Sequence, residues 1–171
     1  EVNTPGAHAA YTHLSDNAIR VATALIHDLY SLENLEIEQA PEVKRAILNG
    51  AAAINAGLGK GASDILNRIT VCVGVIQGGI KINIMPGHCR MEVDIRMPVG
   101  ATHSVLIEHI ERILTRYPQA KYFPIWTHSC EPTYSPPDHE MMQILKTTVV
   151  GLGLPEPAAA VSLGATDSKH W

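Results

Sequence analysis

Arg96 is the residue whose type and position most directly suggest a binding role. It stands on the polar side of an alternating segment, just before a turn at Pro98 and Gly100. A planar guanidinium group can hold a carboxylate through two parallel hydrogen bonds, so Arg96 is a candidate for binding the carboxylate of a small molecule. An ion pair with Asp94 or Glu92 on the same face is the structural alternative.

A loop of small residues near the end of the chain is a second candidate site. Gly164, Ala165 and Thr166 would present backbone N–H groups and a hydroxyl to a substrate, because small side chains let the backbone approach closely. We interpret Asp167 as an acid that orders this loop. The nine histidines are scattered and the three cysteines widely spaced, so neither set by itself predicts a metal site.

The hydrophobic period predicts both helices and strands as the scaffold for these residues. From Asn17 onward, apolar residues recur at intervals of three and four, which predicts a helix with one buried face, with Ser15 and Asp16 as its caps. A helical insertion with a loop is expected over about residues 33–67, where Pro41 precedes an alanine-rich run.

Two segments alternate between apolar and polar residues, as half-buried strands do. The first covers residues 68–77, after which Gly78 and Gly79 predict a hairpin turn into a second short strand that ends near Ile84. The other segment, residues 88–96, has the cleanest alternation, which predicts one packed face and one polar face. Its apolar side consists of Cys89, Met91, Val93 and Ile95.

The order of these elements predicts an α+β fold. A second amphipathic helix ends before Pro118, and a last strand is expected at about residues 122–131. A leading strand, a helix, several strands, then a helix and a final strand make the pattern of a ferredoxin-like split βαβ sandwich, with helices on one face of an antiparallel sheet. Residues 1–131 can form it unaided.

The composition changes beyond Pro132. A helix to about Val150 and a short apolar strand at 158–163 are expected there. About forty residues cannot build a second core, so residues 132–171 are expected to be a truncated segment of another domain.

Composition and charge restrict the class of partner. The chain has 46% hydrophobic residues and a formal net charge of -4, and no basic stripe interleaves with aromatic residues. A nucleic-acid partner is therefore not expected. No apolar run is long enough for a membrane span, and the cysteine pattern suggests no disulfide framework, so we expect a cytoplasmic protein without a membrane partner.

Four segments of the chain contain short motifs: residues 6–11 with His8, 78–86 with Asn83, 94–98 with Arg96, and 164–168. In content and order they resemble motifs of the M20 family of metallopeptidases. This family includes aminoacylases, acetylornithine deacetylases, succinyl-diaminopimelate desuccinylases and carboxypeptidases. Met85 stands where the family usually has Ile or Val, and Ala165 where a second Gly is common; these departures obscure the subfamily more than the family.

The resemblance implies a role for each segment. Residues 1–131 would be a lid that forms a homodimer and covers the substrate, and residues 132–171 a part of the catalytic domain. His8 would reach into the partner's active site and donate a hydrogen bond to the oxyanion of the tetrahedral intermediate. Arg96 and Asn83 would hold the substrate carboxylate, and the loop from Gly164 would also contact the substrate.

The resemblance also implies a metal-dependent reaction. The full-length enzyme would use two zinc ions, or cobalt or manganese, to cleave an amide bond in N-acyl amino acids or small peptides. The aligned segments contain none of the family's metal ligands, so this fragment is expected to bind no metal and to be inactive alone. The alternatives are a dimeric ferredoxin-like module that senses an amino acid without catalysis, and a purely structural oligomerisation domain.

Overall fold

The computed structural model describes residues 1–164, and its contacts divide the chain into two compact units. Unit 1 comprises Glu1–Leu35, Ile69–Arg96 and Thr102–Cys130. Within the described residues, unit 2 comprises Glu36–Arg68, Met97–Ala101 and residues 131–164, so the helical insertion groups with the C-terminal segment. The assignment of these parts to a lid and a catalytic domain stays a prediction.

Unit 1 is built on an antiparallel sheet. Its strands are β1 (Val2–Asn3), β5 (His88–Arg96) and β3 (Thr70–Gly78), which lie in the order β1-β5-β3. Residues 119–121 extend the sheet on the other side of β1, where Ala120 pairs with Val2 and the backbones of Glu1 and Lys121 exchange hydrogen bonds. The predicted α+β class is confirmed, because helices combine with an antiparallel sheet, whereas the ferredoxin-like split βαβ topology stays a prediction.

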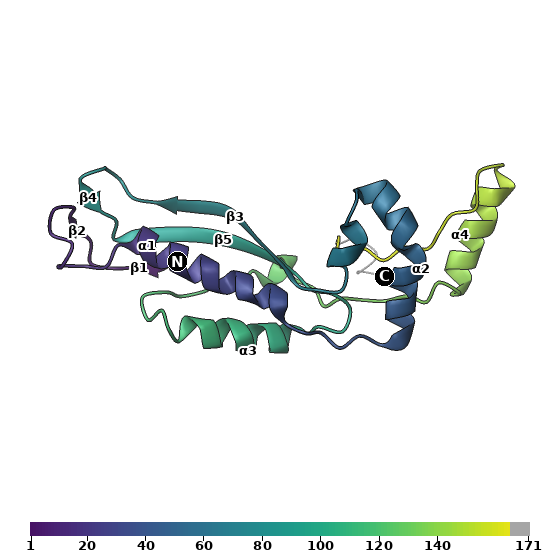
Figure 1. Cartoon of the computed structure of the whole chain (residues 1–171), viewed down its shortest axis with the longest axis horizontal. Helices are drawn as coiled ribbons and strands as arrows, with labels where there is room; N and C mark the ends of the chain where they lie inside the picture. Colours follow the sequence, from purple (N-terminus) through teal and green to yellow (C-terminus); the bar gives the residue numbers. More distant parts are fainter. Residues whose placement is uncertain (165–171) are drawn as a thin grey trace. The chain divides into compact units, whose positions relative to one another are not determined.

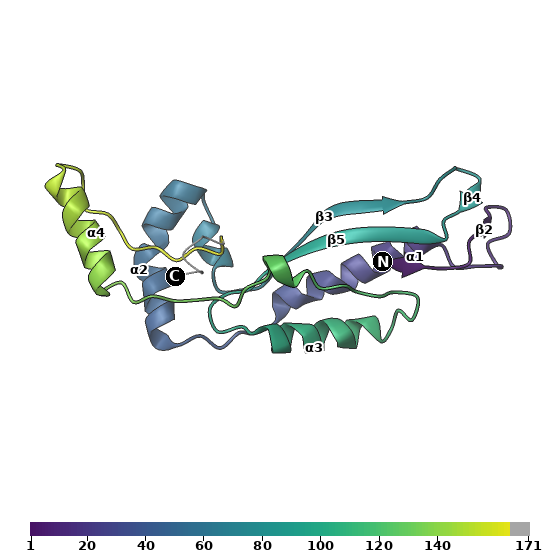
Figure 2. The same cartoon turned by 180° about the vertical axis from the view of Figure 1, so that it is seen from behind.

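Two helices of unit 1 lie on the same side of this sheet (Figures 1 and 2). Helix α1 (Ala18–Leu29) contacts all three strands and continues into a 3-10 turn, η1 (Tyr30–Asn34). Helix α3 (His103–Leu114) packs beside α1. The cap of α1 is Asn17 rather than Ser15 or Asp16, because the Asn17 side chain accepts hydrogen bonds from the backbone N–H groups of Ile19 and Arg20.

The two predicted faces of β5 are confirmed. Cys89 is buried, Met91, Val93 and Ile95 are half-buried, and the polar residues between them are exposed. The register against β3 shifts between Val73 and Val75, where Gly74 is the extra residue of a bulge. The exposed polar residues of β5 are His88, Arg90, Glu92, Asp94 and Arg96.

The predicted hairpin at Gly78-Gly79 is wrong, because β3 pairs with β5 and not with the segment that follows it. Gly79 has a positive φ of 78°, which only glycine adopts without strain, and it turns the chain out of the sheet. The expected short strand does form as β4 (Ile84–Met85), but its partner is β2 (Ala7–His8).

The last predicted strand of unit 1 is also misplaced. The pairing with β1 occurs at residues 119–121, and residues 122–131 contain only a 3-10 turn, η3 (Trp126–His128). Strand β1 offers only two or three residues to pair with, and Pro124 has no N–H to donate to a neighbouring strand.

Unit 2 contains helix α2 (Pro41–Leu58), a 3-10 turn η2 (Ala62–Ile65) and helix α4 (Glu140–Gly151). Its core is Val43, Ile47, Ile54 and Leu66, against which Val161 and Leu163 pack. The strand expected at 158–163 is wrong, because the described part of unit 2 offers no other strand for it to pair with. No helix within residues 1–164 is long and apolar enough to cross a membrane.

We predict that Gly78→Ala destabilises the protein. The new methyl group would lie 3.0 Å from Ile19 Cγ1 and 3.1 Å from Cys89 Sγ, so the free energy of unfolding should fall by about 1–3 kcal/mol. Gly74→Ala is the matched control, because no heavy atom lies within 4 Å of its added carbon. Urea titrations measure both, and an equal loss in the two variants would contradict the proposed close packing.

A second prediction concerns Tyr117, whose O–H donates to Asp28 on α1. This hydrogen bond, together with burial, raises the pKa of Tyr117 above 10.0. The stability that the hydrogen bond contributes is therefore fully present below pH 10 and declines as the pH rises through the raised pKa. Tyr117→Phe should lower the free energy of unfolding by about 1.5 kcal/mol at neutral pH. The difference from the unaltered protein should shrink above pH 10, and Tyr122→Phe, which removes a bond to the exposed Glu111, should cost less.

Candidate functional site

The β2–β4 ribbon brings His8 and Asn83 to the same end of unit 1. His8 lies opposite Ile84, and the backbone N–H of Ala9 donates to the Asn83 carbonyl at 3.0 Å. Two segments far apart in the sequence thus bring the backbones of His8 and Asn83 close together. Both of these residues are exposed to solvent.

The ring of His8 is arranged to donate a hydrogen bond outward. Its Nδ1 accepts the backbone N–H of Ala10 at 3.2 Å, so a neutral ring carries its proton on Nε2. The ring of Tyr11 lies 5.7 Å away, measured between centroids, and is tilted against it. The exposed Nε2–H is therefore a hydrogen-bond donor that a ligand could use.

Arg96 lies at the other end of β5, opposite Thr70 of β3. Its Nε donates to Asp94 Oδ2 at 2.8 Å, with the two side chains 44% and 56% exposed. The structural alternative considered for Arg96 is thus present. An exposed pair of this kind contributes less than about 1 kcal/mol, so it would give way easily to a ligand carboxylate.

Within one chain, Asn83 and Arg96 lie far apart. Strand β5 starts at His88, near the ribbon, and eight steps along an extended strand to Arg96 span about 26 Å. A single carboxylate cannot reach both side chains in one chain. The predicted pair can act on one substrate only if the two residues come from different chains.

The loop that was predicted to contact the substrate, residues 164–168, lies mostly outside the described residues. Gly164 is described, and its N–H donates to Ser162 Oγ at 3.0 Å. Ala165 and Thr166 lie beyond the part of the chain that the structure describes. Their proposed contact with a substrate stays a prediction.

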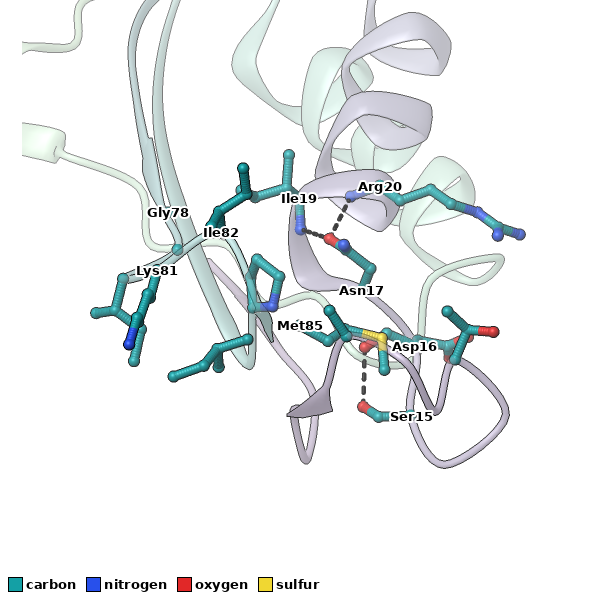
Figure 3. Close-up of a pocket in the computed structure, with 15 residues that line it drawn as sticks. Ser15, Asp16, Asn17, Ile19, Arg20, Gly78, Lys81, Ile82 and Met85 are labelled. Atoms are coloured by element: carbon teal, nitrogen blue, oxygen red, sulfur yellow. Dashed lines mark hydrogen bonds between the residues drawn. The ribbon is translucent and has the colours of Figure 1, made fainter.

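A pocket that the sequence reasoning missed adjoins the ribbon (Figure 3). It has a volume of about 570 Å³ and lies between the start of α1 and the loop from β3 to β4. The alternation Ile80-Lys81-Ile82-Asn83-Ile84 was a possible signal of this pocket. Every second residue is an isoleucine, as in a half-buried strand, but only Ile84 lies in a strand. Its apolar lining consists of Ala9, Ile19, Ile80, Ile82, Ile84, Met85 and Pro86, with Gly78 and Gly79.

The described residues do not form a metal centre. Within residues 1–164, no three side chains of His, Cys, Asp or Glu gather closely enough to hold a metal ion. His8 and His13 lie on either side of Tyr11 in ring contacts, but no carboxylate or thiol completes a ligand set with them. The chemistry open to this part of the chain is hydrogen bonding and charge pairing.

Comparisons with known proteins agree with this fold. Residues 1–120 match the family described as the peptidase dimerisation domain. No curated protein matches the chain by sequence.

Two solved structures resemble the chain over nearly its whole length. The first, an M20 family metallo-carboxypeptidase, Sso-CP2, from Sulfolobus solfataricus, has 14% sequence identity and a TM-score of 0.70 over 96% of this chain. The second, aminopeptidase PepT from Bacillus cereus, has 12% identity and a TM-score of 0.59 over 98% of this chain. The chain spans 44% of the first structure and 38% of the second.

We predict that neutral His8 holds its proton on Nε2. A long-range ¹H–¹⁵N NMR correlation spectrum distinguishes the two tautomers by the chemical shifts of the ring nitrogens. His13 is the control, because no hydrogen bond to its ring is present among residues 1–164, and it should show a mixture of tautomers. A His8 spectrum identical to that of His13 would contradict the hydrogen bond from Ala10.

Proposed function

The chain belongs to the M20 peptidase dimerisation domain family, and from this premise we propose that it is the dimerising lid of a metal-dependent hydrolase. The full-length protein would cleave an amide bond in N-acyl amino acids or small peptides. The lid would supply His8, Asn83 and Arg96 to sites shared between two copies of the chain. The observation that carries the proposal is the separation of His8 and Asn83 from Arg96 along β5.

Strand β3 offers an edge through which two chains can join. It is the outer strand in the order β1-β5-β3, and the backbone groups on an outer edge are free to pair with a strand of another chain. At its start, the N–H of Val71 donates to Glu33 Oε1 at 2.9 Å, so the edge open to a second chain lies beyond Val71.

A two-fold axis at this edge would unite the separated groups. Residue Gly78 marks the end of β3 near His8 and Asn83, and Thr70 marks the end beside Arg96. Two β3 edges that pair antiparallel bring the Gly78 end of one chain towards the Thr70 end of the other. Closed dimers of this kind place the same surface on both chains, so two equivalent composite sites result.

Each residue then has a chemical role that suits its surroundings. His8 donates its Nε2–H to the oxyanion that forms when the amide carbonyl is attacked, an interaction worth about 3 kcal/mol in comparable enzymes. The guanidinium of Arg96 exchanges its exposed partner Asp94 for the substrate carboxylate, and Asn83 adds a neutral amide. Gly164, Ala165 and Thr166 would contact the substrate from the catalytic segment.

The metal ions would be bound outside the described residues. The printed description of Sso-CP2 as a metallo-carboxypeptidase supports a metal-dependent reaction, whereas residues 1–164 contain no ligand set. We propose two zinc ions in the full-length protein, with cobalt or manganese as alternatives. The residues of this chain would bind and orient the substrate.

Mixing two impaired variants tests the composite site directly. In the full-length protein, His8→Ala should lower kcat by about 10²–10³-fold, and Arg96→Ala should raise KM for substrates with a free carboxylate. A hybrid dimer of the two variants keeps one site with both residues intact, so random mixing should restore about one quarter of the sites. Hydrolysis assays before and after subunit exchange measure this recovery.

Arg90→Ala is the matched control, because Arg90 lies on the same face of β5 and also pairs with an acid two residues along, Glu92. It should change neither KM nor the recovery. If mixing restores no activity although hybrid dimers form, His8 and Arg96 act within one chain and the composite site is wrong. If the unaltered protein hydrolyses nothing and binds a free amino acid instead, the amino-acid-sensing module replaces the hydrolase.

A further inference from the structure

The pocket beside the β2–β4 ribbon adjoins the residues that we propose to act on the substrate. Ile84 lines this pocket and lies directly opposite His8, and Ala9 lines it while donating to the Asn83 carbonyl. Side chains directly opposed in an antiparallel pair have Cβ atoms about 5 Å apart. One small molecule can therefore touch both the His8 ring and the Ile84 side chain.

The β3–β4 loop lines the pocket mainly with isoleucines, together with the side chain of Lys81. Ile80 and Ile82 are 85% and 99% exposed, and Ile84 is 38% exposed. Such a concentration of exposed isoleucines costs free energy in water and marks surfaces that bind something apolar. The three isoleucines are every second residue from 80 to 84, and Asn83 lies between the last two of them.

Most polar groups on the opposite wall are engaged within the protein. The Asn17 amide oxygen caps α1, Ser15 Oγ accepts the Gly6 N–H at 3.0 Å, and Gln119 donates to the Asp16 carboxylate at 2.8 Å. The Arg20 side chain extends away from the isoleucines (Figure 3). The isoleucines are therefore the part of the pocket best suited to a ligand.

The pocket is also held in shape by backbone bonds. The N–H of Ala18 donates to the Pro86 carbonyl at 2.9 Å, and the N–H of Ile84 donates to the Lys81 carbonyl at 3.1 Å. Its volume of about 570 Å³ lies in the range of small-molecule sites. An apolar side chain can enter a hollow of this size beside a hydrogen-bond donor. The flat surface of a protein partner would fill it less well.

We infer that this pocket is a specificity subsite, which receives an apolar side chain or acyl group next to the scissile amide. The substituents of the carbonyl carbon lie within a few ångströms of the oxyanion, so a group flanking that carbon reaches Ile84 when the oxyanion reaches His8. The inference rests on the proposed function and narrows its substrate class to amides that carry an apolar group beside the scissile bond.

The test compares pairs of substrates that differ only in leucine against alanine beside the scissile bond. With the full-length protein, the leucine substrate should have the higher kcat/KM, and Ile84→Thr or Ile82→Thr should reduce that preference about tenfold. Threonine retains the β-branch that suits a strand, so the fold should persist. The matched control is Ile125→Thr, an exposed isoleucine outside the pocket, which should leave the preference unchanged.

Two results would overturn the subsite. An unchanged leucine preference in both pocket variants, with turnover retained, would show that the isoleucines do not contact the substrate. Equal loss of activity on both substrates, accompanied by dissociation of the dimer in sedimentation, would show that a second copy of the chain covers this surface instead.

A separate measurement distinguishes failure of the subsite from failure of the proposed function. If the unaltered full-length protein hydrolyses no substrate, the proposed function falls, and the pocket is tested on the chain alone by isoleucine methyl NMR. Shifts at Ile82 and Ile84 but not Ile125 on adding millimolar N-acetylleucine would retain an apolar binding site. No shift at any of the three would overturn it.

Discussion

The close contact between α1 and the end of β3 is the constraint on which the geometry of unit 1 depends. Ile19 and Cys89 both lie so near Gly78 that a Cβ atom at this position would be 3.0 Å from the first and 3.1 Å from the second, which is tighter than ordinary packing. The absence of a Cβ at Gly78 lets the helix approach the sheet closely there, and Gly79 then takes the chain out of the sheet. The loop that follows leads into β4, which pairs with β2 and so positions the candidate residue His8. The packing of α1 on the sheet and the position of His8 therefore both depend on Gly78 and Gly79.

The same scaffold separates functional groups that would have to act together. A hydrogen-bonded strand is stiff, and β5 keeps its two ends apart whatever the surrounding loops do. An active site assembled from both ends therefore exists only in an assembly of chains, so its abundance would follow the concentration of dimer. Such an enzyme loses activity on dilution even when every chain remains folded.

Sequence reasoning predicted those features that depend on local period. The helix from Asn17 and the two faces of β5 were correct, because amphipathic period directly reflects burial. Pairing could not be predicted in this way: nothing local shows that β3 selects β5, or that residues 119–121 rather than 122–131 meet β1. At the candidate site, motif resemblance proposed His8, Asn83 and Arg96, and these roles stay predictions. The separation of these residues depends on strand register, and the pocket forms only when the loop before β4 folds against α1.

The short strand at residues 119–121 has a consequence for how far the sheet can extend. Pro118 precedes it and Pro124 follows closely, so the outer edge beside β1 offers very few donors to another chain. If two copies paired through β3, the long edge of the described sheet would be covered, and only the short strands at residues 119–121 would remain as outer edges. The assembly would stop at two chains, and the fold would resist the open-ended fibre growth to which sheets with free long edges are prone.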